Sequence, residues 1–323
     1  MAGYNTIRGL RVKYLSANPS NPEEGQVWYN STTGSLKGYV LAPATVVSSG
    51  NANTARTQLG STGTLTAGIM FGGESPSLTG ATEEFDGSSF ANGGTCPASK
   101  SDMHSSGTQT AALWGGGSPS SSGSFEYDGS SWTGVGAMTF AGRDFTGGGV
   151  GIQTAALQIG GFISPGNFSN VMQEYNGSSW SNISGTFPTG PNTGGFASCG
   201  TQTAALSSGG PSGATATLSW DGSSWTTVNS LGIGASGAVQ RGTVGNAIMA
   251  TGHPASPPTY GVEIQTWDGT NWSTSPITFS TGRAQAAGFG TAAGLAVAAG
   301  APGLASSEIY TEGAVAVSTL TTS

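Results

Sequence analysis

The residues that most often carry out chemistry are few in this 323-residue chain. It has two histidines, His104 and His253, and two cysteines, Cys96 and Cys199, all far apart in the sequence. A zinc site needs closely spaced Cys or His ligands, as in H-E-x-x-H or paired C-x-x-C, and neither pattern occurs. The histidines are predicted to lie at the surface or in loops and the cysteines to be free thiols, with a disulfide as the alternative. We expect no metal, no cofactor and no catalytic residue.

Cationic side chains show a more regular pattern. Four of them precede a recurring glycine motif by 7 or 8 residues and a fifth precedes it by 4; they are Arg56, Lys100, Arg143, Arg283 and, in the displaced position, Arg241. Equivalent positions of a repeat form a ring, so these bases are predicted to lie near one rim and to bind an anionic glycan or partner surface. The alternative is that each guanidinium bonds loop carbonyls or a nearby acid such as Asp102 or Asp144.

Two further patterns concern glycine. The segment 232–237 matches G-x-G-x-x-G, which binds dinucleotides where a helix follows within a βαβ unit. It lies between two repeat units, so nucleotide binding is not expected. Four acidic residues each precede a glycine, namely Asp86, Asp128, Asp221 and Asp268, and Asn176 takes this place in one copy. They are predicted to form Asx hydrogen bonds within tight turns, with calcium binding as the alternative.

A repeat of about 45 residues must position these side chains. The hexapeptide FDGSSF at 85–90 returns as YDGSSW at 127–132, YNGSSW at 175–180, WDGSSW at 220–225 and WDGTNW at 267–272. A second motif runs in phase, beginning at Gly63, Gly107, Gly151 and Gly200, with weaker copies from Gly245 and Gly290. Short apolar runs, Asp-Gly hairpin signals and the tryptophans that follow them predict four short strands per unit. The residues expected to hold this repeat together are Gly87, Trp132, Trp180, Trp225 and Trp272.

One unit carries a recognisable order of residues. Between 115 and 143 the chain has Gly-Gly, then Tyr-Asp, then Trp, then Arg, which are Gly115, Gly116, Tyr127, Asp128, Trp132 and Arg143. This order resembles the kelch repeat, and the resemblance covers about residues 54–323. It implies an all-β fold in which residues 51–323 form a six-bladed β-propeller of four-stranded blades. The last two units are degenerate at the Gly-Gly position.

Residues 1–50 lack the repeat and hold four of the nine bases. The strands QVWYN and LKGYV, joined by STTGS, predict a β-hairpin module. The residue pattern of this segment resembles that of attachment modules in bacteriophage virion proteins, especially those of marine phages. The repeats resemble kelch-like phage structural proteins. The resemblance implies a virion anchor, whose candidate residues are Arg8, Arg11, Lys13, Trp28, Tyr29 and Lys37. The alternative is an ordinary flanking hairpin that packs on the propeller.

Composition limits the function further. The net charge is −7 and there is no basic block, which argues against nucleic-acid binding. No run of about 18 apolar residues occurs, so no membrane span is expected. Together with these limits, the resemblance to phage proteins implies a non-enzymatic virion protein whose propeller decorates capsid or tail, or serves as a tail-fibre adhesin. Its expected partners are other virion proteins, a host-surface glycan or protein, and further copies of itself. The alternatives are an internal virion spacer or stabiliser and a carbohydrate-active propeller enzyme.

Overall fold

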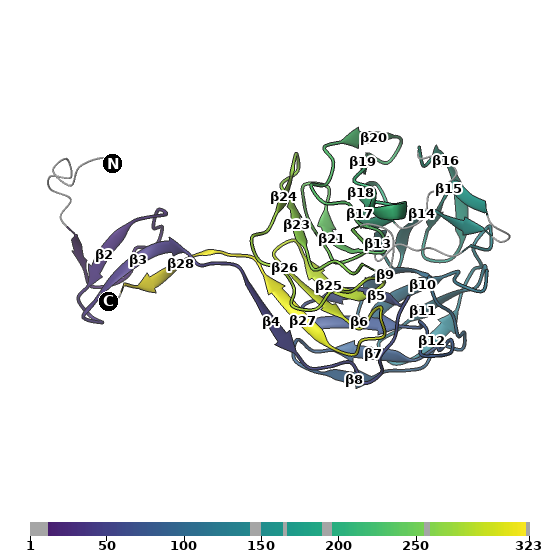
Figure 1. The fold of residues 1–323 in the computed structure, drawn as a ribbon, viewed down its shortest axis with the longest axis horizontal. Helices are drawn as coiled ribbons and strands as arrows, with labels where there is room; N and C mark the ends of the chain where they lie inside the picture. The colour runs from purple at the N-terminus through teal and green to yellow at the C-terminus, as the bar shows by residue number, and fades with distance from the viewer. Residues whose placement is uncertain (1–11, 143–149, 164–166, 189–195, 255–258, 321–323) are drawn as a thin grey trace. The chain divides into compact units, whose positions relative to one another are not determined.

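The protein is all-β, as the sequence predicts. The computed structural model describes residues 12–142, 150–163, 167–188, 196–254 and 259–320. These residues form seven four-stranded sheets, none of which closes on itself, and one short 3-10 helix, η2 (Pro211–Gly213), with no α-helix among them (Figure 1). The chain divides into two compact units. Unit 1 comprises residues 1–45 and 312–323, and unit 2 comprises residues 46–311.

Six of the sheets lie in unit 2, and in the first five of them four consecutive short strands are joined as antiparallel neighbours. The first five are β5 (Gly60–Thr64), β6 (Ala67–Phe71), β7 (Thr82–Phe85) and β8 (Phe90–Asn92); β9 (His104–Thr108), β10 (Ala111–Gly115), β11 (Ser124–Tyr127) and β12 (Trp132–Gly134); β13 (Val150–Ile152), β14 (Ala155–Ile163), β15 (Asn167–Tyr175) and β16 (Trp180–Thr186); β17 (Phe196–Thr201), β18 (Ala204–Gly209), β19 (Thr217–Trp220) and β20 (Trp225–Val228); and β21 (Val239–Thr243), β22 (Asn246–Ala250), β23 (Ile264–Trp267) and β24 (Trp272–Thr274). The repeat of the sequence is therefore a repeat of sheets.

The sixth sheet draws its strands from both ends of unit 2. It contains β25 (Ala287–Thr291), β26 (Gly294–Ala298) and β27 (Ser307–Thr311), and its fourth strand is β4 (Thr45–Ser49) (Figure 1). The first strands contact one another in chain order, from β5 through β9, β13, β17 and β21 to β25, and β25 contacts β5 in turn. The six sheets thus follow one another in a cycle that returns to its start.

The seventh sheet makes up unit 1. It has the order β1 (Lys13–Leu15), β2 (Val27–Asn30), β3 (Ser35–Leu41) and β28 (Val315–Thr319). Strands β2 and β3 form the expected hairpin, β1 runs parallel to β2, and β28 pairs antiparallel with β3. The division therefore differs from 1–50 and 51–323. The end of the chain belongs with the first module because β28 completes its sheet, and residues 46–49 belong with unit 2 because β4 completes the sixth sheet.

A glycine one residue before the end of each first strand sets the register of the repeat. In the first four sheets and the sixth it is the predicted glycine, and in the fifth it is Gly242, with φ +124°, three residues before the predicted Gly245. A Cβ at Gly242 would lie 2.3 Å from the carbonyl oxygen of Asn246, so only glycine fits this turn. This register moves Arg241 into strand β21, away from the position that the other four bases share. Gly87 likewise has φ +101°, in the turn that follows Asp86.

Tryptophans connect neighbouring sheets, as the sequence predicts. Each indole N–H reaches back to the third strand of the preceding sheet: Trp132 to Thr82 Oγ1 at 2.9 Å, Trp180 to Ser124 Oγ at 2.9 Å, Trp225 to Met172 Sδ at 3.0 Å, and Trp272 to Thr217 Oγ1 at 3.0 Å. Since these rings are largely buried between sheets, each adds both apolar contact and a directed hydrogen bond.

A second set of connections was not predicted from the sequence. The glutamine of each G-x-Q-T-A-A-L motif donates from Nε2 to two carbonyls of the preceding sheet; the residues are Gln109, Gln153 and Gln202, with distances between 2.8 and 3.1 Å. The glutamines join the ends of the second and third strands of one sheet to the next sheet. Their recurrence in the motif was the signal that could have revealed this role.

Candidate functional site

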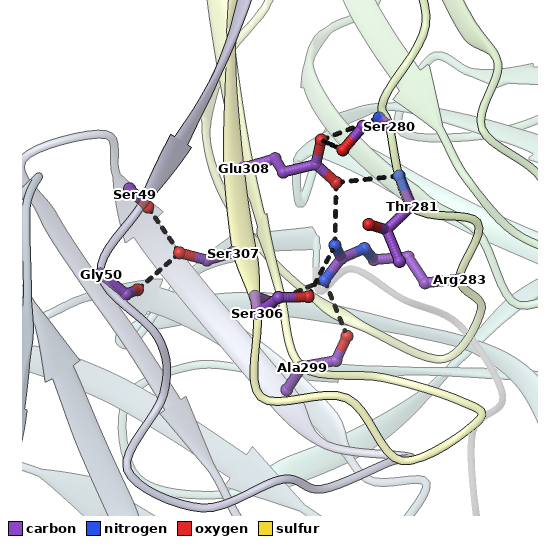
Figure 2. A network of polar contacts seen from close by, with 9 residues as sticks. All are labelled: Ser49, Gly50, Ser280, Thr281, Arg283, Ala299, Ser306, Ser307 and Glu308. Carbon is purple, nitrogen blue, oxygen red and sulfur yellow. Dashed lines mark hydrogen bonds and ion pairs between the residues drawn. The ribbon is translucent and has the colours of Figure 1, made fainter.

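Two of the predicted rim cations, Arg56 and Arg283, lie at equivalent places in the first and sixth sheets and are fully buried. Arg283 donates to the carbonyl oxygens of Ala299 at 3.1 Å and Ser306 at 2.7 Å, and its Nη2 lies 3.0 Å from Glu308 Oε2. Figure 2 shows this guanidinium enclosed by its partners. Arg56 repeats the pattern, bonding two carbonyls at 2.8 Å and Glu83 at 2.8 Å.

Each glutamate of these pairs also holds the loop that leads into its sheet. Glu308 accepts hydrogen bonds from the backbone N–H of Ser280 at 2.8 Å and of Thr281 at 3.2 Å, and from the hydroxyl of Ser280 at 2.6 Å (Figure 2). Glu83 accepts from two consecutive backbone amides, those of residues 53 and 54, at 2.6 and 3.2 Å. The pair of charges therefore fixes a connection between sheets, and its role is architectural.

Burial governs the ionisation of these groups. It lowers the pKa of both arginines, and the neighbouring glutamate only partly offsets this by its charge and hydrogen bond. For Glu308, burial acts to raise the pKa, but the hydrogen bonds from Ser280 and Thr281 and the charge of Arg283 together outweigh it, so the pKa is lowered. The glutamate is thus held as a carboxylate.

In other sheets a glutamine stands in the place of the glutamate and holds the corresponding loop without an ion pair. In the fifth sheet Gln265 Oε1 accepts from the N–H of Ile233 at 3.0 Å and its Nε2 donates to the carbonyl of Ile233 at 2.8 Å, while Ala235 stands seven residues before Gly242, in the place of the arginine. In the third sheet Gln173 Oε1 accepts from the N–H of Thr139 at 2.6 Å. In the fifth sheet an uncharged glutamine thus replaces the glutamate where alanine replaces the arginine.

The remaining predicted rim bases have different environments. Lys100 is partly exposed, and its Nζ donates to the carbonyl of Pro119 at 2.9 Å. Arg143 lies outside the described residues. Arg241 is 8% exposed, and it donates to carbonyl oxygens of Gln240, Ser61 and Gly288 at 2.7–2.9 Å. Burial lowers the pKa of Arg241 to about 10.

The predicted anion-binding rim is therefore corrected for Arg56, Arg241 and Arg283. Their guanidinium groups are inaccessible to a surface ligand and bond carbonyls or glutamates, as in the structural alternative. The paired acids are Glu83 and Glu308, which come from the third strand of a sheet. Asp102 receives a hydrogen bond from Gln58 at 3.1 Å, and Asp144 lies outside the described residues.

The histidines and cysteines are placed as follows. His104 is buried in β9, edge-on to the ring of Trp180, which corrects the expected surface position. Burial lowers the pKa of His104 to about 4. His253 is partly exposed, with Nδ1 2.7 Å from the carbonyl oxygen of Thr259. Both cysteines are free and buried, and burial raises the pKa of Cys96 to about 12 and of Cys199 to about 11.

The acidic turns are Asx turns, as predicted. Asp128 Oδ1 accepts from the backbone N–H groups of Ser130 and Ser131, both at 2.8 Å, and the other copies repeat these bonds. The hydrogen bond from the backbone of Ser131, followed by those from Ser130, lowers the pKa of Asp128 to about 2. Within the described ranges no three His, Cys, Asp or Glu side chains are grouped so that they could hold a metal ion.

The candidate anchor residues lie in unit 1, apart from Arg8 and Arg11, which are outside the described residues. Trp28 is fully buried, and its Nε1 donates to Asn18 Oδ1 at 3.2 Å, so it forms the core of this small unit. Lys13 is exposed on β1, and Lys37 donates to Thr319 Oγ1 at 2.6 Å. Tyr29 is partly buried.

Unit 1 also carries an exposed apolar surface that the sequence analysis did not identify. Five of the seven large apolar side chains that are exposed in the described residues belong to it: Val12, Tyr14, Val27, Leu41 and Val317. Side chains alternate between the faces of a sheet, so the register Lys13–Trp28 places Val12, Tyr14, Val27 and Tyr29 together on the face opposite Trp28. We call these four residues the apolar face. The rings of Tyr14 and Tyr29 lie 4.7 Å apart, and Tyr14 is 76% exposed.

No protein-family model matches this chain, and a search of curated proteins finds no match. In the part of the chain that the structure describes, no helix has the length and hydropathy needed to span a bilayer.

Proposed function

We propose that the chain is a non-enzymatic structural protein of a bacteriophage virion. In this proposal unit 2 is a six-bladed kelch-like β-propeller, displayed on capsid or tail for adhesion or decoration, and unit 1 attaches it to the particle. The cycle of six four-stranded sheets supports the propeller, with unit 1 as the seventh sheet. The fourth strand of the sixth sheet comes from the start of unit 2, which would join the ends of the ring.

The observation that carries the attachment role is the apolar face of unit 1. Monomeric proteins usually bury their large apolar side chains, and a contiguous exposed group of them marks an interaction site. Here Tyr14, Val12 and Val27 are 76%, 42% and 38% exposed on one face of a sheet of only four strands. Binding to a second virion protein would remove this surface from water.

Charge favours a particular kind of partner for the propeller. Unit 2 has five bases and thirteen acids, and three of those bases are buried. Its surface is therefore acidic, which disfavours an anionic glycan. We infer that a host-surface glycan or protein bound by unit 2 is neutral or basic.

A particle carrying a variant chain tests the attachment role. The change Val12→Ser, Tyr14→Ser and Val27→Ser affects exposed side chains, so the variant should fold, and mass spectrometry of purified particles should show that it is lost from them. The matched control is Val47→Ser in unit 2, whose side chain is 53% exposed and which should be retained. The proposal fails if the unaltered chain is absent from particles, or if the triple variant is retained like the control.

A map of the intact particle separates the remaining alternatives. A propeller on the outside supports adhesion or decoration, and a propeller enclosed by other proteins supports the spacer or stabiliser role. The carbohydrate-active enzyme is the less favoured alternative because Glu83 and Glu308 are engaged with buried arginines and the aspartates with their own turns. Hydrolysis of host-surface glycans by the purified chain would overturn the non-enzymatic assignment.

A further inference from the structure

Strand β28 forms one edge of the sheet of unit 1. It pairs with β3 on one side, in a register that sets Val317 opposite Tyr39. Just beyond the two ends of this ladder, the N–H of Leu320 donates to the carbonyl of Leu36 and the N–H of Ala42 to that of Ala314, both at 2.9 Å. These bonds show which residues of β28 direct their backbone toward β3.

Hydrogen-bonded pairs alternate along an antiparallel ladder. Because residues 314 and 320 bond to β3, residues 316 and 318 do so as well. The backbone groups of Val315, Val317 and Thr319 therefore point away from the sheet. They form a row of three donors and three acceptors along the edge, in the spacing that a further antiparallel strand requires.

In its described residues, this edge lacks the features with which a strand itself usually prevents further pairing. Charged residues, proline, a bulge or a very short strand prevent edge-to-edge pairing. The opposite edge, β1, is three residues long and carries Lys13. Strand β28 has five residues, VAVST, with no charge, no proline and no register shift against β3, and Val317 is 38% exposed.

We propose that two copies of this chain associate through β28, pairing antiparallel about a two-fold axis at Val317. Val317 then lies opposite Val317 of the second copy, and Val315 lies opposite Thr319. All the outward backbone groups find partners in this register, and the result is one sheet of eight strands. An apolar row crosses the junction, because Tyr39 is next to Val317 in each copy.

The charge of the chain favours this antiparallel arrangement with a second copy. The two connections to unit 2 leave the same end of the sheet, where Ala42 bonds to Ala314. Antiparallel pairing places the connections of the two copies at opposite ends of the joined sheet. Parallel pairing would bring both connections, each of which continues into an acidic unit, out at the same end. Since β28 itself is uncharged, self-pairing brings no like charges together.

Sedimentation of the full-length chain tests the association. We expect a dimer of twice 31.9 kDa at micromolar concentration. Val317→Lys sets two like charges opposite each other on the axis and should raise the dimer dissociation constant by at least about tenfold. The matched control is Val47→Lys, which introduces the same charge at an exposed valine of unit 2 and should leave the constant unchanged. Far-ultraviolet circular dichroism checks that both variants fold.

Cysteine variants test the register independently of that result. Under mild oxidation with diamide, Val317→Cys should form a disulfide-linked dimer by itself. Val315→Cys and Thr319→Cys should each remain uncross-linked alone and form a linked dimer when mixed. The native thiols are buried and serve as the background in the unaltered chain.

Three outcomes would overturn the proposal. The first is a folded chain that stays monomeric at about 100 µM, a concentration well above the micromolar range in which we expect the dimer. The second is a dimer that Val317→Lys does not weaken, and the third is a dimer in which Val317→Cys does not cross-link. The proposal does not depend on the virion role, so it can fail or hold independently of that role.

Discussion

Glu308→Ala should destabilise unit 2 by about 3–5 kcal/mol, because it leaves the guanidinium of Arg283 buried without its countercharge. The side chain of Arg283 is fully buried, so water cannot replace the carboxylate 3.0 Å away. The substitution also leaves the backbone N–H groups of Ser280 and Thr281 without their acceptor. Both consequences act on the same connection between the fifth and sixth sheets.

Removing both charges together should cost much less than removing one. In the double variant Arg283→Met, Glu308→Gln, an apolar chain of similar length fills the arginine's space and the amide oxygen still accepts from the loop. The fifth sheet already has such an arrangement, with Gln265 and Ala235 in these places. Replacement of a buried pair by uncharged groups of similar volume is often close to neutral, so we expect a loss below about 2 kcal/mol.

Urea unfolding followed by tryptophan fluorescence measures these changes, since six of the eight tryptophans lie in the repeated motifs of unit 2. Hydrogen exchange at Ser280 and Thr281 reports the local effect. Glu174→Gln, at a glutamate bonded to the exposed Ser181 at 3.3 Å, is the control and should stay within about 0.5 kcal/mol. A loss below about 1 kcal/mol for Glu308→Ala, or a double variant as unstable as the sum of both single variants, would refute this reasoning.

The lowered pKa of Glu308 adds a dependence on pH. A carboxyl group with a lowered pKa in the folded state stabilises the fold above its unfolded pKa, ~4.3, and loses that contribution as the pH falls through the folded value. The urea midpoint of the unaltered chain should therefore fall below pH ~4 more steeply than that of the double variant. Equal slopes for the two proteins would contradict this assignment.

Four further substitutions test other parts of unit 2. Trp132→Phe removes the indole hydrogen bond to the buried hydroxyl of Thr82, and it should lower the free energy of unfolding in urea by about 0.5–1.5 kcal/mol beyond the effect of the lost volume. Trp225→Phe should lower it by less, because the acceptor of that indole is a sulfur. The reverse order would count against the tryptophan connections. Burial lowers the pKa of His104 to about 4, so stability should fall as the pH drops below the unfolded value of ~6.5. His104→Gln should flatten urea midpoints measured between pH 7 and 4.5, and an unchanged slope would argue against a buried neutral histidine. Asp128→Asn keeps the turn's acceptor oxygen but removes the titration that ends at about pH 2, so thermal midpoints between pH 4 and 2 should become less dependent on pH than in the unaltered chain.

Local patterns were sufficient to predict the repeated elements. The Asp-Gly turns and the tryptophans that follow them recur at nearly constant spacing, and each forms its turn and strand from residues close in sequence. The hairpin of β2 and β3 was predictable for the same reason, since its two strands are separated by four residues. Hydrogen bonds such as those of Asp128 to residues 130 and 131 need only the local backbone.

The sequence alone could not predict pairings between distant segments. Nothing in VAVST marks it as the partner of β3. Lys37 on β3 and its hydrogen-bond partner Thr319 on β28 are 282 residues apart in the sequence. The same holds for β4, which completes the sixth sheet. The apolar face was hidden for a related reason, because alternation predicts two faces for a strand and says nothing about which one is covered.

What the sequence determined about this protein is its all-β class, its repeated four-stranded unit and the turns and aromatic contacts of that unit. The tertiary structure decided which cations are available. The sequence predicts Arg56 and Arg283 to be surface bases, because charged residues are usually exposed. They are buried because Glu83 and Glu308, 27 and 25 residues further along, return beside them on the third strand of the sheet. A charge can remain in the interior only where a countercharge or enough hydrogen-bond acceptors converge on it, and that convergence exists only in the folded chain.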